Sequence, residues 1–238
     1  MVAPAGSSAI VIGATGLVGR ECVRQLAAHP GFERVTALVR RALPSDLVAA
    51  KVKTELVDFD RLDARPEVFQ ATHLFCALGT TIKQAGSQDR FRQIDFDYPL
   101  RAAELALAAG VRHFLLVSSV DANPVSRSFY LRVKGELEAA IEGLGFRSVT
   151  VIRPSLLLGD RNEFRLTEEI AKRLAWAFPR KYRPVHARDV TAALIAAAAE
   201  DRPGVNLIEN RGIARTPHPS RQRPTWADSE AQDDTRSR

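Results

Sequence analysis

The chain has few cysteines and no long hydrophobic run. Only two of its 238 residues are cysteines, and the spacing of Cys22 and Cys76 suits neither a metal site nor a disulfide framework. We therefore expect two small core residues and no metal. No stretch approaches the roughly 18 apolar residues of a membrane span. Residues 1–7 also lack the charged start and apolar core of a signal peptide, so the sequence predicts a cytoplasmic protein without a membrane span.

Aromatic residues and concentrated positive charge are also scarce. Aromatic residues make up 7% of the chain, and the net charge of +6 is spread among acidic residues along its whole length. A nucleic-acid-binding protein would instead concentrate basic residues on one face, so we expect no nucleic-acid partner. The hydrophobic content of 45% is enough for a sizeable core. A chain of this length fits one α/β domain, alone or with a small appendage.

A glycine-rich stretch near the start predicts a binding site for a dinucleotide. A short apolar run at residues 9–12 reads as a buried strand and is followed by Gly13, Gly16 and Gly19. Gly13 permits a tight turn, Gly16 lets the backbone approach phosphates, and Gly19 lets the helix expected over residues 17–28 pack closely on the strand. The amino end of that helix then faces the anion. Three neighbours complete the predicted site: Thr15, Leu17 and Val18. A glycine-rich turn of another α/β protein is the alternative.

Two arginines predict which dinucleotide is bound. Arg40 and Arg41 follow a strand expected over residues 34–39, and no acid occurs between Val35 and Leu43. An NAD site places an acid here for the ribose 2′-hydroxyl, whereas guanidinium groups suit a 2′-phosphate. The sequence therefore predicts NADP(H). The alternative is that one or both arginines simply end the strand in solvent.

Asp58 and Phe59 follow the next expected strand, at residues 52–57. The Asp58 carboxylate at this strand end would accept from the adenine amino group. Equally, it would cap a helix expected over residues 62–70. Both readings stay open.

A fourth strand, at residues 73–77, leads into Leu78, Gly79 and Thr80. A glycine at the carboxyl end of a central strand lets the backbone approach a cofactor. A polar loop is expected over residues 82–88. A long helix follows over residues 90–109, with a kink at Pro99.

The predicted catalytic residues follow the fifth strand, at residues 113–117. Ser118 and Ser119 end that strand, and Tyr130 and Lys134 lie four residues apart on a helix expected over residues 129–142. A nearby ammonium lowers the pKa of a tyrosine towards values useful for acid/base work, and Ser119 would stabilise a developing oxyanion. Alone, a tyrosine packed on a helix stem and a solvated lysine give the same spacing, so the order of all the motifs carries the argument.

Strands alternating with helices predict a doubly wound parallel sheet of Rossmann type. We divide the chain into a dinucleotide-binding domain (1–159), a small substrate-side lobe (160–212) and a disordered tail (213–238). Within the lobe we expect a helix over 166–177, an extended segment over 184–187, a helix capped by Asp189 and a strand over 205–208. His186 is either a pocket residue or a packed histidine ahead of that helix.

Seven segments carry a resemblance to a known family: GATGLVGRE (13–21), LVRR (38–41), VDFDRLD (57–63), CALGTT (76–81), HFLLVSS (113–119), FYLRVKGELEA (129–139) and RPSLLLGDR (153–161). Over roughly residues 8–212, in order, the chain resembles the atypical short-chain dehydrogenases/reductases. It is most similar to the Tat-interacting-protein family, the oxidoreductases related to human HIV Tat-interactive protein.

The resemblance implies a Rossmann domain that binds NADPH, with Ser119, Tyr130 and Lys134 as the catalytic triad. It also implies that the segment with Pro154 and Leu156 lies beside the nicotinamide. The loop 121–128 is particular to this chain, so the shape of the substrate pocket is not transferable.

Two functions are expected from this pattern. The first is an NADPH-dependent oxidoreductase acting on a small carbonyl/alcohol substrate. The second is a non-catalytic NADPH-binding module that regulates a protein partner, because the relatives are known more for binding and regulation. Nucleotide-sugar epimerisation is weaker, since such enzymes usually carry a larger carboxyl-terminal domain.

Overall fold

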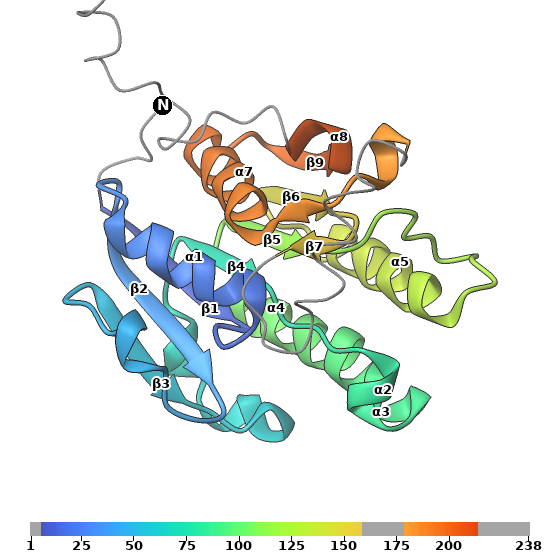
Figure 1. The fold of residues 1–238 in the computed structure, drawn as a ribbon. Helices are drawn as coiled ribbons and strands as arrows, with labels where there is room; N and C mark the ends of the chain where they lie inside the picture. The colour runs from blue at the N-terminus through green and yellow to red at the C-terminus, as the bar shows by residue number, and fades with distance from the viewer. Residues whose placement is uncertain (1–5, 159–178, 214–238) are drawn as a thin grey trace, which may run out of the picture.

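The computed structural model describes residues 6–158 and 179–213. Seven parallel strands in this part of the chain form one sheet, in the order β3-β2-β1-β4-β5-β6-β9. Helices cover both faces of the sheet (Figure 1). The strands are β1 (Ser7–Ile12), β2 (Phe32–Val39), β3 (Val52–Leu56), β4 (His73–Cys76), β5 (His113–Val117), β6 (Ser148–Arg153) and β9 (Gly204–Glu209). This confirms the predicted Rossmann-type fold.

Four of the described α-helices, α1, α4, α5 and α7, have 11 to 14 residues, and the others are short. The α-helices are α1 (Leu17–Ala28), α2 (Ile82–Ala85), α3 (Gln88–Arg92), α4 (Tyr98–Ala108), α5 (Phe129–Glu142), α7 (Ala187–Glu200) and α8 (Asn210–Ile213). The 3₁₀ turns are η1 (Ser45–Leu47), η2 (Phe59–Ala64), η3 (Pro66–Phe69) and η5 (Arg180–Tyr182), and η4 (Gln93–Asp97) is a π-helical turn. A second, small sheet pairs β7 (Leu157–Leu158) with β8 (Val185–His186).

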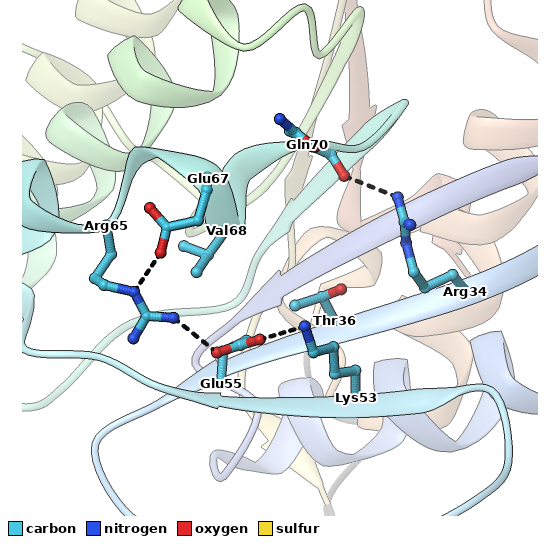
Figure 2. Close-up of a pocket in the computed structure, with 8 residues that line it drawn as sticks. All are labelled: Arg34, Thr36, Lys53, Glu55, Arg65, Glu67, Val68 and Gln70. Carbon is cyan, nitrogen blue, oxygen red and sulfur yellow. Dashed lines mark hydrogen bonds and ion pairs between the residues drawn. The ribbon is translucent and has the colours of Figure 1, made fainter.

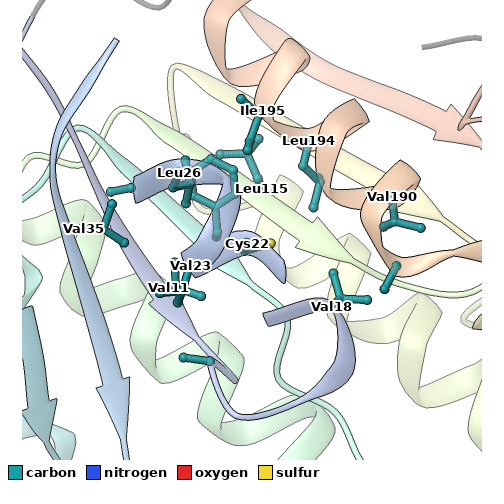
Figure 3. Close-up of a cluster of buried hydrophobic side chains, with 14 of the residues drawn as sticks. Val11, Val18, Cys22, Val23, Leu26, Val35, Leu115, Val190, Leu194 and Ile195 are labelled. Carbon is teal, nitrogen blue, oxygen red and sulfur yellow. The ribbon is translucent and has the colours of Figure 1, made fainter. Parts of the chain in front are cut away.

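Alternate residues of the central strands feed two separate cores, because successive side chains of a strand point to opposite faces. On β1, Val11 packs into one cluster with α1 and α7, while Ile10 and Ile12 pack into the other with α4 and α5. Figure 3 shows the first cluster, in which Cys22 and Leu26 of α1 pack with the apolar side chains of α7 on the same face of the sheet. Both faces of the sheet are therefore sealed by apolar contacts, which explains why its strands are apolar runs.

The strand order reverses direction at the carboxyl end of β1. The chain leaves β1 towards β2 and β3 on one side, and it returns to β4 on the other side. In open α/β sheets, ligands bind in the crevice outside the strand ends where the order reverses. The predicted site segments that follow β1, β2, β4, β5 and β6 all lie at this one edge, because all these strands are parallel.

Two local predictions were wrong. Residues 62–70 do not form one helix, because Pro66 forces the residue before it out of the helical region and Arg65 takes φ −134° and ψ 50°. Two 3₁₀ turns, η2 and η3, stand in its place. The polar stretch 82–88 is not wholly a loop, because Thr81 caps the short helix α2 by accepting from the Gln84 N–H at 3.1 Å.

The long helix predicted over residues 90–109 runs over residues 88–108, with a π-helical turn inside it. The turn η4 precedes Pro99, which has no N–H to donate into the helix. The expected irregularity is therefore confirmed, but it takes the form of a π turn ahead of the proline. Such turns widen a helix locally and often occur at functional sites. Asp95, in the middle of this turn, is completely buried.

The elements of residues 179–213 pack on the main sheet. α7 lies beside α1 on one face, and β9 pairs with β6 as the last strand (Figure 1). α7 begins at Ala187, so Asp189 lies in its first turn and does not occupy the predicted capping position. The helix expected over 166–177 and the tail from residue 214 lie outside the described residues. The division of the chain after residue 159 remains a prediction.

Candidate functional site

The glycine turn between β1 and α1 is too tightly packed to admit side chains at two of its positions. Gly13 has φ +78°, and a Cβ on it would lie 2.4 Å from the Ala77 carbonyl oxygen at the end of β4. A Cβ on Gly19 would lie 2.0 Å from the Gly13 carbonyl oxygen. Both contacts are with backbone and cannot be relieved by a rotamer change. The two glycines therefore bring the turn, the start of α1 and the end of β4 together, as the spacing predicts.

The amino end of α1 offers backbone donors without a competing side chain. Gly16 caps the helix with no side-chain hydrogen bond from the described residues, and the first turn carries no acid. Thr15 is exposed and Leu17 is half-buried. The side chain of Val18 is buried in the core, so Val18 can contact a ligand only through its backbone. Unpaired N–H groups and the helix dipole make such an end suitable for an anion.

Arg40 and Arg41 lie directly after β2, at the same edge of the sheet. Both are exposed, and within the described residues neither guanidinium has a hydrogen-bond or ion-pair partner. They are therefore free to bind a phosphate. Two arginines that simply end the strand in solvent would have the same geometry, so both interpretations stay open.

Asp58 acts as a local cap. Its carboxylate accepts from the Asp60 N–H at 3.0 Å and begins η2, while the side chain of Phe59 is buried beneath it. Asp58 is therefore a cap, but of η2 and not of the helix predicted over residues 62–70, which does not form. Its exposed second oxygen leaves the adenine contact open as a prediction.

The segment after β4 leads to a buried ion pair that sequence reasoning missed. The Thr80 N–H donates to Oδ2 of Asp95 at 2.8 Å, and Oδ1 of Asp95 lies 2.7 Å from Nζ of Lys134. A Cβ on Gly79 would lie 3.3 Å from Oδ1 of Asp95 and 3.6 Å from Nζ of Lys134, so Gly79 sits directly against the pair. Leu78, before it, is half-buried against the second core.

Lys134 is fixed by this pair. It is 4% exposed and Asp95 is fully buried, although both are ionisable. Burial lowers the pKa of Lys134, but the carboxylate of Asp95 and the hydroxyl of Tyr130 together raise it more, so the pKa lies above its ordinary value. The sequence offers one signal for Asp95, which is an acidic residue on an otherwise apolar face of the predicted helix. Only the fold shows that its partner is Lys134.

Tyr130 lies in the first turn of α5, near enough to Lys134 to affect its charge. Its ring is half-buried and packs on Phe91 with a centroid separation of 5.7 Å. Within the described residues its hydroxyl has no hydrogen-bond partner. The predicted pair of Tyr130 and Lys134 is therefore brought together, with an aromatic ring behind the tyrosine.

The two serines after β5 differ in their surroundings. Ser118 is buried, and its hydroxyl has no partner among the described residues. Ser119 is half-buried, and its hydroxyl donates to the Val120 carbonyl at 3.3 Å. This weak local bond leaves the Ser119 oxygen able to reorient towards a ligand.

The segment after β6 is anchored by ion pairs. Arg153 pairs with Glu138 of α5 at 2.5 Å and with Glu209 of β9 at 3.4 Å. After it, Pro154 is buried and Leu156 is 54% exposed. The segment predicted to flank the nicotinamide therefore begins at Arg153, which is ion-paired to α5 and β9, and it carries the exposed apolar side chain of Leu156.

The loop before α5 is tied to residues 181–182. The carboxylate of Asp121 accepts from Lys181 and, at 2.8 Å, from the Tyr182 hydroxyl. These bonds hold the pKa of Asp121 below its ordinary value. His186, the other candidate of this region, pairs in β8 with Leu158 and directly precedes α7, as expected for a packed histidine.

A separate pocket lies at β2 and β3 (Figure 2). Its volume is about 250 Å³. Arg65 and Lys53 both pair with Glu55 there, at 3.0 and 2.6 Å, and Arg65 also pairs with Glu67, so both cations are already engaged within the pocket. It contains none of the predicted site residues. Its lining residues are Arg34, Thr36, Lys53, Glu55, Arg65, Glu67, Val68 and Gln70.

Most of the chain matches a known protein family. Residues 13–201 match a protein family described as NAD(P)H-binding. The chain belongs to this NAD(P)H-binding family. It is 38% identical over 212 residues to Protein HTATIP2 of Rattus norvegicus, covering 87% of each chain. It is also 38% identical over 159 residues to Protein FMP52-1, mitochondrial, of Scheffersomyces stipitis, covering 65% of this chain and 69% of that one.

Solved structures share the fold of this NAD(P)H-binding chain. MoeE5 in complex with UDP-glucose and NAD superposes with a TM-score of 0.67 at 19% identity, covering 84% of this chain and 74% of that one. UDP-glucose 4-epimerase of Thermotoga maritima superposes with a TM-score of 0.63 at 15% identity, covering 80% and 72%. The family match and the sequence relatives identify the chain as an atypical short-chain dehydrogenase/reductase that resembles HTATIP2 and binds a nicotinamide dinucleotide. The solved structures show that it shares their fold. None of its helices within residues 6–158 and 179–213 has the length and apolar character needed to cross a membrane.

Proposed function

We propose that this protein is an NADPH-dependent oxidoreductase that interconverts a small carbonyl compound and its alcohol. The observation that carries the proposal is the position of Lys134, a buried ammonium held by Asp95 and close to the hydroxyl of Tyr130. A buried lysine is costly unless it is paired, so its retention beside a tyrosine at a ligand-binding edge favours a chemical role.

The residues present fit a dinucleotide. The backbone at Gly13 and Gly19 leaves no room for side chains, and the uncapped amino end of α1 suits the pyrophosphate. Arg40 and Arg41 would hold the 2′-phosphate of NADPH through bidentate bonds. The other proposed contacts are those of Thr15, Gly16, Leu17, Val18, Asp58, Phe59, Leu78, Gly79, Thr80, Ser118, Pro154 and Leu156. When bound, the cofactor supplies or accepts a hydride.

Side chains of the protein would transfer the proton and stabilise the charge that develops on the substrate oxygen. Tyr130 would donate its hydroxyl proton to the substrate oxygen during reduction and recover one from solvent afterwards. Lys134 favours the tyrosinate that forms, and its charge is held in place by Asp95. Ser119 would donate a hydrogen bond to the same substrate oxygen and stabilise negative charge on it.

A second function is favoured by one specific observation. The carboxylate that fixes Lys134 also neutralises it, which weakens its effect on Tyr130. A site of this kind would bind NADPH and use it to shape a surface for a protein partner, without turnover. Both proposals place the protein in the cytoplasm. Fractionation of cells that produce the tagged chain would distinguish this location from the mitochondria.

The experiment that separates the two functions is a titration of NADPH fluorescence, followed by the addition of aldehydes and ketones. Tyr130→Phe is the test variant. Tyr98→Phe is the matched control, because the Tyr98 hydroxyl bonds to Asp60 away from the catalytic residues. Binding, followed by loss of NADPH in the wild type and in Tyr98→Phe but not in Tyr130→Phe, supports the oxidoreductase. Binding with no loss on any compound supports the regulatory module, and absence of binding contradicts both.

A further inference from the structure

A cluster of two histidines and an aspartate lies at the amino ends of β4 and β5, away from the edge that carries the predicted site. His73 begins β4 and His113 begins β5, and the two residues face each other in register. Asp201 follows α7 and caps its carboxyl end. His73 is 2% exposed and His113 is 1% exposed, so both rings are buried.

One polar atom of each residue is buried and has no hydrogen-bond partner in the described part of the chain. These atoms are Nε2 of His73, Nδ1 of His113 and Oδ1 of Asp201. They all lie within 4.8 Å of one another, and Nδ1 of His113 is 3.6 Å from Oδ1 of Asp201. Buried polar atoms are rarely left unpaired, so three that converge on one point call for an explanation.

The outer nitrogens of both rings are held by threonines. Nδ1 of His73 lies 2.7 Å from the Thr72 hydroxyl, which donates its own proton to the Ser8 carbonyl at 2.8 Å. Metal binding requires the tautomer in which Nδ1 of His73 donates to the Thr72 hydroxyl, which leaves a lone pair on Nε2 facing the cluster. Nε2 of His113 lies 2.9 Å from the Thr150 hydroxyl. Outer hydrogen bonds of this kind orient the histidine ligands of metal ions.

The carboxylate is oriented in the same way. Oδ2 of Asp201 pairs with Arg147, and Oδ1 is left to face the two rings. Asp201 has φ 44°, in the left-handed region that aspartate and asparagine tolerate better than most residues. This conformation ends α7 and turns the side chain back towards the sheet.

We propose that His73, His113 and Asp201 form a binding site for a zinc-class divalent metal ion. Two imidazoles and one carboxylate are typical ligands of Zn²⁺, with a fourth position left for water. Zinc bonds of about 2.0–2.2 Å require ligand atoms roughly 3.4 Å apart, so separations of up to 4.8 Å must close by as much as ~1.4 Å. The ion would join the end of α7 to the starts of two central strands, so its binding would stabilise the fold. This proposal replaces the expectation of no metal drawn from the cysteines.

Coordination through Nδ1 of His113 requires that this ring carries its hydrogen on Nε2, towards the Thr150 hydroxyl. The competing occupant of the cluster is a single proton on Nδ1 of His113, shared with Nε2 of His73 and Oδ1 of Asp201.

The test uses the full chain without a histidine tag. The protein is incubated with Zn²⁺ and separately with Mg²⁺, passed through gel filtration in chelator-treated buffer, and analysed for metal by mass spectrometry. We expect about one zinc per chain, a higher melting temperature with zinc, and no retained magnesium, because Mg²⁺ prefers oxygen ligands.

Asp201→Asn is the decisive variant, because asparagine keeps the left-handed turn while removing the ligand charge. We expect its zinc affinity to fall by at least ~100-fold. Thr150→Val keeps the shape of a buried residue and should weaken binding by roughly 10–100-fold through the orientation of His113. His29→Asn removes a histidine from outside the cluster and should bind zinc like the wild type.

Melting in EDTA checks that each variant folds. Zinc that stays with the wild type and His29→Asn, but not with Asp201→Asn, supports the site. No retained zinc in the wild type, or equal retention in Asp201→Asn, overturns the proposal and leaves the shared proton as the occupant of the cluster.

Discussion

The ammonium of Lys134 lies 2.7 Å from Oδ1 of Asp95, and both side chains are at most 5% exposed. Lys134 comes from α5 and Asp95 from the π turn ahead of α4, so the pair joins two helices on the same face of the sheet. The second oxygen of Asp95 accepts from the Thr80 N–H after β4. A single carboxylate therefore connects the strand end, the long helix and the helix that carries Tyr130.

Asp95→Asn should destabilise the protein by about 3–5 kcal/mol, because it leaves the Lys134 ammonium buried without a counter-charge. Urea unfolding monitored by circular dichroism measures the change. Asp95→Leu combined with Lys134→Met removes both charges and should recover most of the loss. Asp63→Asn is the control, because it breaks an exposed pair with Arg101 and should cost no more than ~1 kcal/mol. A cost for Asp95→Asn as small as that of the control would contradict a structural role for the pair.

Gly19→Ala should abolish measurable NADPH binding. The added methyl would lie 2.0 Å from the Gly13 carbonyl oxygen, so either α1 or the turn has to move. We expect the dissociation constant to rise by at least ~100-fold, since small displacements in a positioned site have effects of that size. Fluorescence titration gives the constant. Gly143→Ala is the matched control, because its methyl would make ordinary contacts of 3.5 and 3.6 Å. Unchanged NADPH binding in Gly19→Ala would show that the turn does not hold the cofactor.

Replacing both Arg40 and Arg41 with Gln should reduce the preference for NADPH over NADH by about 10–100-fold. Each hydrogen bond to a charged phosphate contributes about 1.5–3 kcal/mol, and neither arginine is engaged elsewhere in the described residues. Parallel titrations with the two cofactors give the ratio. Arg202→Gln changes the net charge at an exposed ion pair with Glu200 and should leave the ratio unaltered. Equal loss of affinity for NADPH and NADH would count against recognition of the 2′-phosphate.

The sequence predicts the sheet and the glycine turn well because both depend on local patterns. Apolar runs such as residues 9–12 and the packing demand of Gly19 are encoded within a few neighbouring positions. A local pattern does not settle residues 62–70, where Pro66 excludes Arg65 from the helical region and two 3₁₀ turns replace the predicted helix. A single pre-proline residue was enough to divide the expected helix.

Contacts between distant residues account for what the sequence leaves open. Asp95 and Lys134 are 39 positions apart, and no periodicity connects them. The cluster of His73, His113 and Asp201 depends on the register of two strands and on the left-handed turn after α7. Such groups become visible only when the fold brings them to one point. The predicted triad was easier to find because two of its members share one helix.

The two cysteines should be unreactive in the folded protein. Burial raises the pKa of Cys22 and that of Cys76 to about 12, against 9.0 for an ordinary thiol, so the reactive thiolate is suppressed roughly 1,000-fold. A thiol reagent such as DTNB should label neither residue at pH 8 within minutes, and raising the pH to 9 should still leave labelling slow. After unfolding in guanidinium, both thiols should react at once. Rapid labelling of the native protein would show that the core around α1 or β4 opens readily, and the single variants Cys22→Ala and Cys76→Ala would show which one.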